Sequence, residues 1–296
     1  MVPQDTLNLG IWDRIVRGWR MTKLGVKVVR ADPELLVYTF ISLILSLGIS
    51  LIIISGTIGL EALVPENTDG NSDEEEAAFA VATLSLVFLG YLGISVVTVF
   101  WNAAIIASAY ERLTSGTNPS FSFGIKKASE CLPSIFIWGI ISGTVGVILK
   151  ILEGIGQESK SPVAIFALLI SWILGAAWWM LTFFVVPTLV LEKNGVLDSL
   201  QSSPKLFVDT WGENAGATGG LGLIQFAVSI MCLSICIPFF LLGDYGAIFG
   251  IILTLFLFGL ISLFFVTIDS VNRATMYYYA KTGEMPPMAE KVGITF

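Results

Sequence analysis

Histidine is absent from this sequence of 296 residues, and its absence removes several kinds of chemistry. Nucleophile systems of the Ser-His-Asp or Cys-His type need an imidazole base, and histidine is the commonest metal ligand. Cysteine is scarce too, since the three thiols Cys131, Cys232 and Cys236 fall in or at the ends of apolar runs. They suggest neither a disulfide framework nor a metal site. We therefore expect no enzyme activity, no catalytic residue, no metal site and no cofactor.

Charged residues are also few, at 13% of the chain, against 55% hydrophobic residues and a mean hydropathy of +0.82. A soluble domain carries about 25% charged residues, so this composition indicates an integral membrane protein. Six apolar runs reach the roughly 20 residues that a helix needs to cross a bilayer. They lie near 35–60, 77–109, 132–152, 163–191, 217–242 and 247–268. The predicted fold is all-α and polytopic, because single helices satisfy their own backbone groups in lipid.

Basic residues divide unevenly between the loops that join these runs. If the N-terminus is cytoplasmic, 14 of the 16 lysines and arginines fall inside and only Lys150 and Lys160 fall outside. Because basic residues near short loops stay cytoplasmic, we predict a multi-pass protein of the cell membrane with both termini inside. The expected parts are a cytoplasmic N-terminal segment (1–33), a six-helix transmembrane domain (34–279) and a cytoplasmic tail (280–296). The net charge of −7 argues against a nucleic-acid partner.

Each predicted span that returns to the cytoplasmic side ends in a similar short sequence. This repetition suggests three units, each with a surface helix and a helical hairpin. In the first surface segment, IWDRIVRGWRMTK, helical spacing separates an apolar side from a basic side. A helix of this kind lies in the membrane interface beside anionic headgroups. A second segment, VLDSLQSSPKLFVDTW, offers Phe207 and Trp211 in the same manner. Anchoring, lipid recognition and gating are the alternatives, and the predicted interfacial residues are Trp12, Arg14, Arg17, Trp19 and Arg20.

The segment GATGGLG, residues 216–222, looks at first like the glycine fingerprint of a dinucleotide-binding fold. That fingerprint needs a strand before it and a helix after it, whereas polar residues precede this segment and a long apolar run follows. Glycines four apart instead make a helix face on which another backbone packs closely in lipid. A hinge is the other alternative. The predicted packing glycines are Gly139, Gly143, Gly212, Gly216, Gly219 and Gly220.

Polar and tryptophan side chains gather toward the cytoplasmic half of the spans, whose middles carry no ionisable residue. Ion-coupled transporters usually retain such mid-membrane charges, so their lack argues against a pump. We expect the gathered side chains either to bond and pack between helices or to form a pocket for a solute or lipid headgroup. This candidate cluster comprises Trp101, Asn102, Trp178, Trp179, Gln225, Asp269, Asn272 and Arg273.

Four stretches carry a resemblance to a known family: ADPELLVYTFISL, WGIISGTVGVILKILE, AAWWMLTFFVVPTLVLEKNG and LFVDTWGENAGATGGLGLI. Together they resemble an uncharacterised prokaryotic family of six-span membrane proteins, a domain of unknown function frequent in archaea. In plan the chain is more distantly similar to the membrane domain of some glycerophosphodiester phosphodiesterases. The resemblance implies an architecture and a prokaryotic cell membrane, and it brings no catalytic residues.

Three functions agree with these observations. A homo-oligomeric channel or pore for small solutes or ions agrees with the glycine faces. The first outer loop, EALVPENTDGNSDEEE, has seven carboxylates and no basic residue, and it would enrich cations at the mouth of such a pore. A lipid-binding or membrane-scaffolding protein agrees with the surface helices and makes membrane lipids, anionic at the cytoplasmic face, the expected partners. A secondary transporter would have to build its site from backbone carbonyls at breaks in the helices.

Overall fold

The computed structural model describes residues 10–63, 73–157 and 162–294, and these ranges contain helices and short connections but no strand. The all-α prediction is confirmed. Long helices pack in successive pairs: α3 (Glu34–Leu63) with α4 (Asp73–Ser115), α6 (Leu132–Gln157) with α7 (Pro162–Thr182), and α10 (Trp211–Phe240) with α11 (Gly243–Thr282). The shorter helices are α2 (Ile11–Ala31), α5 (Phe121–Glu130), α8 (Val185–Leu191), α9 (Val196–Asp209) and α12 (Pro287–Lys291).

Six helical segments are long and apolar enough to cross a membrane, which confirms the predicted number of spans for the described residues. Two helices continue well past the predicted ends of their spans. α4 extends to Ser115 and α11 to Thr282, so these helices are 43 and 40 residues long. A bilayer requires only about 20 residues, and the additional turns lie where the helices converge. α11 ends at Gly283, whose φ of 76° gives the left-handed cap that glycine adopts without strain.

The fourth span is interrupted at Phe183 and Phe184, between α7 and α8. Pro187 explains the break, because proline has no amide hydrogen to donate to the carbonyl oxygen four residues earlier and its ring crowds that carbonyl. The amide of Phe184 donates instead to Ser203 Oγ of α9 at 3.0 Å. The break therefore ties the fourth span to α9.

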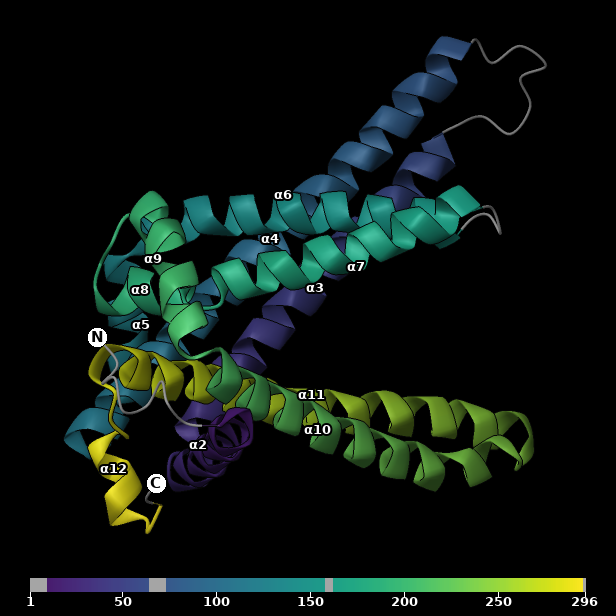
Figure 1. The fold of residues 1–296 in the computed structure, drawn as a ribbon. Coiled ribbons are helices and arrows are strands. Elements are labelled where there is room, and N and C mark those ends of the chain that lie inside the picture. Colours follow the sequence, from purple (N-terminus) through teal and green to yellow (C-terminus); the bar gives the residue numbers. More distant parts are fainter. Residues whose placement is uncertain (1–9, 64–72, 158–161, 295–296) are drawn as a thin grey trace.

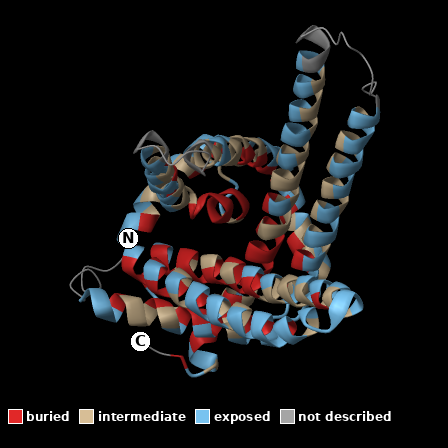
Figure 2. Ribbon diagram, turned by 90° about the vertical axis from the view of Figure 1, so that its right-hand side faces the viewer, coloured by how far each residue is buried: buried red, intermediate tan, exposed pale blue. Residues whose placement is uncertain are grey.

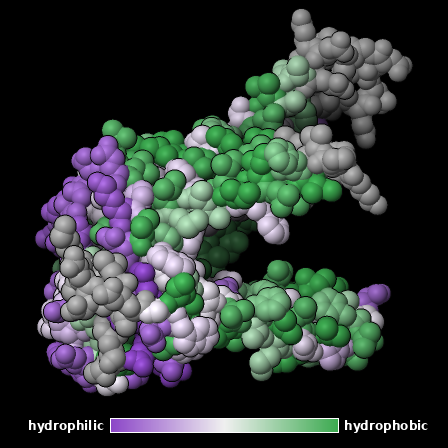
Figure 3. Space-filling view, in the orientation of Figure 1, coloured by the Kyte–Doolittle hydropathy of each residue, from purple (hydrophilic) through white to green (hydrophobic). Residues whose placement is uncertain are grey.

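The molecule has two parts, which we call the base and the arms (Figure 1). The base contains α2, α5, α8, α9 and α12 together with the adjoining ends of the long helices, and both ends of the described chain lie there. The arms are the outlying parts of the three helix pairs, which diverge from the base. Hydrophilic residues cover the base and hydrophobic residues cover the arms (Figure 3).

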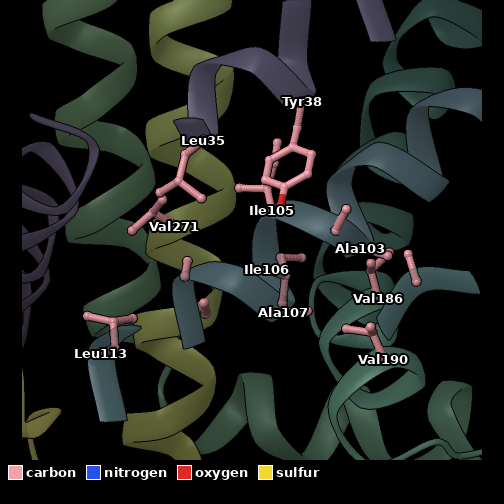
Figure 4. Close-up of a cluster of buried hydrophobic side chains, with 14 of the residues drawn as sticks. Leu35, Tyr38, Ala103, Ile105, Ile106, Ala107, Leu113, Val186, Val190 and Val271 are labelled. Atoms are coloured by element: carbon pink, nitrogen blue, oxygen red, sulfur yellow. The ribbon is translucent and has the colours of Figure 1, made fainter. Parts of the chain in front are cut away.

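The hydrophobic core lies in the base. Figure 4 shows Tyr38 of α3, Ile105 of α4, Val186 of α8 and Val271 of α11 among its buried side chains. Tyr38 is 1% exposed, and its hydroxyl donates to the Phe121 carbonyl oxygen of α5 at 2.7 Å. Buried residues concentrate where the helices meet, and exposed residues prevail on the arms (Figure 2).

Candidate functional site

The N-terminal helix α2 lies across the first turns of α10, where the two backbones touch (Figure 1). A Cβ atom added at Gly216 would collide with the backbone of Ile15. One added at Gly18 would collide with the carbonyl oxygen of Glu213. Backbones approach this closely only where glycine removes the intervening side chains. The glycine-rich start of the fifth span is therefore the surface on which α2 packs.

The other predicted packing glycines fall into two groups. Gly212 faces Arg14 and Gly220 faces the ring of Trp19, so both belong to the contact with α2, whereas Gly139 and Gly143 of α6 face α4. Gly219 is the exception, because no atom lies within 4 Å of a Cβ added there. The structure contradicts the packing prediction at Gly219, which lies on the exposed side of α10.

A buried ion pair fixes the contact between α2 and α10. Arg14 Nε lies 3.0 Å from Glu213 Oε2, and Arg14 Nη2 donates to the Asp209 carbonyl oxygen at 2.7 Å. The Tyr279 hydroxyl of α11 donates to Glu213 Oε1 at 3.5 Å and accepts a hydrogen bond from Arg17 Nη1 at 2.8 Å. Glu213 is 1% exposed, so removing either charge would leave the other buried without compensation. The network holds α2, α10 and α11 in one register.

This network corrects the prediction for Arg14, which was expected on the headgroup side of α2 and is buried instead. Arg17 is half-buried for the same reason, since it reaches toward Tyr279. Trp12 is 74% exposed, while Trp19 is half-buried over Gly220. α2 still has an outward basic face, but it uses residues further along the helix: Arg20, Lys23, Lys27 and Arg30 are exposed.

The predicted polar and aromatic cluster is not one cluster. Asn102 accepts a hydrogen bond from Ser270 at 3.1 Å, and Asn272 faces Thr22 of α2 at 3.4 Å. The remaining members lie in separate places: Trp101 beside Tyr38, Trp178 stacked on Trp138, Trp179 against Phe183 and Phe207, and Arg273 paired with Asp269 at 2.9 Å. Gln225 is half-exposed on α10 and makes no hydrogen bond to the others within the described ranges. Most of these side chains join helices to one another.

An apolar hollow of about 500 Å³ lies where the α6–α7 arm and the α10–α11 arm meet the base. α7, α9 and the start of α10 form its walls. In Figure 3 the surface is deeply hollowed between these two arms. The largest lining side chains are Trp179, Met180, Phe207, Val208 and Trp211. Two of its walls, α7 and α10, belong to helices that are long and apolar enough to cross a membrane, and the third wall is α9 of the base.

The helix α9 gives the hollow its shape. Its inner face buries Ser199, Ser203 and Phe207 against the break in the fourth span, and its outer face exposes Leu197 and Val208. The Trp179 ring packs edge-on against Phe207, with ring centroids 5.5 Å apart. Sequence periodicity identified Phe207 and Trp211 as an apolar side of this segment. Periodicity could not predict their contact with Trp179 of α7, because that contact depends on the break in the fourth span, which lets α9 pack against α7.

One comparison with known proteins bears on these features. A family of unknown function (DUF6159) matches residues 81–286. The chain belongs to this family. The match contains the walls of the hollow, four of the six spans and most of the span in α4, while α2 and α3 precede it. No curated protein sequence matches the chain. Membership in DUF6159 supports the predicted resemblance to an uncharacterised membrane family, while an archaeal source and a likeness to phosphodiesterase membrane domains stay predictions.

Proposed function

We propose that this protein is a non-enzymatic, multi-pass protein of the cell membrane that holds a lipid acyl chain in the hollow between α7, α9 and α10. The apolar hollow itself carries the proposal. Its volume of about 500 Å³ falls within the range of ligand pockets, and its lining is almost wholly apolar. Within a bilayer an apolar space of this size fills with hydrocarbon, because water finds no hydrogen-bond partner there.

The base faces the cytoplasm in this proposal, and both termini lie with it. The hydrophilic surface of the base and the basic residues of α2 support this orientation, as does the 14-to-2 division of basic residues. Arg20, Lys23, Lys27 and Arg30 then face the inner leaflet, where each basic residue near an anionic surface contributes about 1 kcal/mol. Protease added to intact cells is expected to cut around 67–76, a loop that lies mostly outside the described residues, and cleavage near Lys281 instead would reverse the orientation.

The pore and transporter hypotheses gain no supporting observation. A homo-oligomer was inferred from glycine faces that would pack between subunits, but five of these glycines pack within one chain. Gly216 and Gly220 pack on α2, Gly139 and Gly143 on α4, and Gly250 on the side chains of Phe239 and Phe240 at the outer end of α10. These five glycines therefore need no second subunit to explain them, whereas Gly219, Gly222 and Gly259 have no atom within 4 Å of an added Cβ.

Native mass spectrometry in mild detergent tests the lipid proposal. Wild-type protein is expected to retain a phospholipid that exchanges slowly. Ala215→Phe places a ring in the hollow and is expected to abolish this retention, because Ala215 lines the hollow. Ala227→Phe is the matched control, since Ala227 is exposed on the same helix outside the hollow. Equal retention by the Ala215→Phe and Ala227→Phe variants would refute the proposal.

A further inference from the structure

A second hollow, of about 300 Å³, lies in the base. Four elements converge on it: α4, α5, the end of α8 with the residues after it, and α11. Its lining contains the aromatic side chains Tyr110, Phe123 and Tyr277 together with charged side chains of both signs. We call it the charged pocket. Its mixed lining of rings, lysines and carboxylates differs from the apolar lining of the hollow beside α9.

Three lysines from three different elements line the charged pocket. Lys281 Nζ of α11 lies 2.5 Å from Glu192 Oε1, and Lys193 Nζ lies 3.0 Å from Glu130 Oε2. Lys127 Nζ of α5 lies 5.6 Å from the centroid of the Phe123 ring. Ammonium groups that converge from separate elements onto one space are suited to an anionic group of a ligand.

Glu192 is a structural member of the charged pocket. It accepts hydrogen bonds from the Tyr277 hydroxyl, from Lys281 and from Asn194. Burial raises the pKa of Glu192, but these donors outweigh burial and leave the pKa below its ordinary value. The carboxylate therefore stays charged at neutral pH and holds α11 to the segment after α8.

Two charged groups of the charged pocket lack an ion-pair partner within the described part of the chain. Lys127 lies beside the Phe123 ring and attracts Glu130 from a distance without forming an ion pair, and Glu111 of α4 makes no side-chain hydrogen bond or ion pair there. The Tyr110 hydroxyl likewise makes no hydrogen bond within these ranges. The pocket thus leaves a cation, an anion and a hydroxyl for a ligand.

From this geometry we infer that the charged pocket binds a small zwitterion, a molecule with one ammonium group and one anionic group. The anionic group contacts Lys127 and Lys193, and the ammonium group contacts Glu111 and the ring of Tyr110. Both contacts are charge-assisted, and a cation over an aromatic face gains further attraction. The lining carries three lysines and the carboxylates of Glu111 and Glu192. Glu130, outside the lining, balances Lys193, so the pocket with its border is neutral and favours a neutral zwitterion over a simple anion.

Such a zwitterion has two sources, a phosphoethanolamine lipid headgroup and a soluble amino acid or amino phosphate. Both present an ammonium group a few bonds from an anion. This inference is independent of the proposed acyl-chain site, because the two hollows share no lining residue. The Ala215→Phe variant is expected to leave the charged pocket unchanged.

Isothermal titration of the full-length protein in detergent tests the inference, with glycerophosphoethanolamine, glycerol phosphate and ethanolamine as probes. Only glycerophosphoethanolamine is expected to bind well. Lys127→Met and Glu111→Gln are each expected to weaken its binding by about tenfold or more, since each removes a hydrogen bond to a charged group. Lys126→Met is the control, because Lys126 is exposed on α5 and does not line the pocket. Thermal unfolding of each variant checks that it is folded.

Three results would overturn the inference. Equal binding of glycerol phosphate, unaffected by Glu111→Gln, would make the pocket an anion site. Binding of ethanolamine that survives Lys127→Met would make it a cation site, and no binding of any probe would exclude a zwitterion. Competition from phosphatidylethanolamine in nanodiscs would assign the zwitterion to a lipid, and the lack of competition would assign it to a soluble molecule.

Discussion

The base and the arms are built from the same helices but held together by different forces. In the arms large apolar side chains point outward, and Leu51, Leu84 and Leu255 are 66%, 69% and 68% exposed. In the base side chains of the same kind are enclosed, and Met21 and Leu24 of α2 are 0% exposed. The buried carboxylate of Glu213 and the buried amides of Asn214 and Asn272 also lie in the base.

The difference shows where the fold is specified. Hydrocarbon tails are as apolar as leucine, so the arms gain little from contacting one another in a membrane. The base holds close backbone contacts, an enclosed core and polar groups that have few alternative partners. We therefore infer that the base determines how the three helix pairs are joined, and that the arms follow. Four substitutions, each with a matched partner, test this division in order of expected effect.

The largest effect is expected from Gly216→Ala. The new methyl group would collide with the backbone of Ile15, and a backbone cannot move aside as a flexible side chain can. A loss of more than about 4 kcal/mol, or failure to recover folded protein, is expected. Gly219→Ala is the control, because nothing lies within 4 Å of the added atom and alanine favours a helix by about 1 kcal/mol. Equal melting temperatures in detergent would show that α2 does not pack as described.

Next in size is the buried ion pair of the base. Glu213→Gln removes the charge that Arg14 faces, and leaving a buried charge unpaired costs about 3–5 kcal/mol. The control is Glu153→Gln on the α6 arm. Lys150 Nζ lies 2.7 Å from Glu153 Oε2, and the Lys150 side chain is 72% exposed. An exposed pair of this kind contributes about 0–1 kcal/mol. Chemical unfolding of both variants measures the difference, and similar losses would remove the distinction between base and arm.

Leucine truncation compares the two regions without any change of charge. Leu24→Ala opens a cavity in the enclosed core of the base and is expected to cost about 2–5 kcal/mol. Leu255→Ala exchanges one lipid-facing apolar side chain for another, and we expect a loss below about 1 kcal/mol. Unfolding in nanodiscs is the appropriate measurement, because a bilayer then covers the arms. A large loss at Leu255 would mean that the arms pack against something in the membrane.

Sequence patterns predicted the arms well and the base poorly. Hydropathy depends on each residue and its near neighbours, so the six spans follow directly from apolar runs longer than 20 residues. The structure of the base depends on contacts between residues that are far apart in the sequence. Arg14 and Glu213 are separated by 199 positions, and no periodicity in either segment indicates that they meet. Arg14 was therefore predicted to face headgroups. The glycine face of α10 was predicted too, but the sequence did not show that α2 packs on it.

The candidate site shows the same limit. Spacing of four placed Gly212, Gly216 and Gly220 on one helix face, and this pattern marks a contact without naming the partner. The polar residues near the cytoplasmic ends of the spans were predicted to form one cluster, because the sequence indicates only how deep in the membrane each residue lies. In the folded chain their direction around each helix also matters. For this reason Asn102 and Asn272 face different helices.

The smallest expected effect concerns pH and lies at the edge of the base. The pKa of Glu192 is below its ordinary value of 4.5, because Lys281, Tyr277 and Asn194 donate to the charged form and outweigh the opposing effect of burial. A carboxylate whose pKa is lowered by folding stabilises the folded state above its unfolded pKa and loses that contribution as the pH falls through the folded value.

Glu192→Gln is accordingly expected to cost about 1–2 kcal/mol near neutral pH, the usual size for a hydrogen bond to a charged group. The deficit relative to wild type should shrink as the pH falls below 4.5, because the wild-type carboxyl group then gains its own proton. Thermal unfolding over a pH series measures this difference, and Glu284→Gln, at an exposed position after α11, controls for the loss of one negative charge. A deficit that stays constant down to acid pH would show that Glu192 acts through its shape and not its charge.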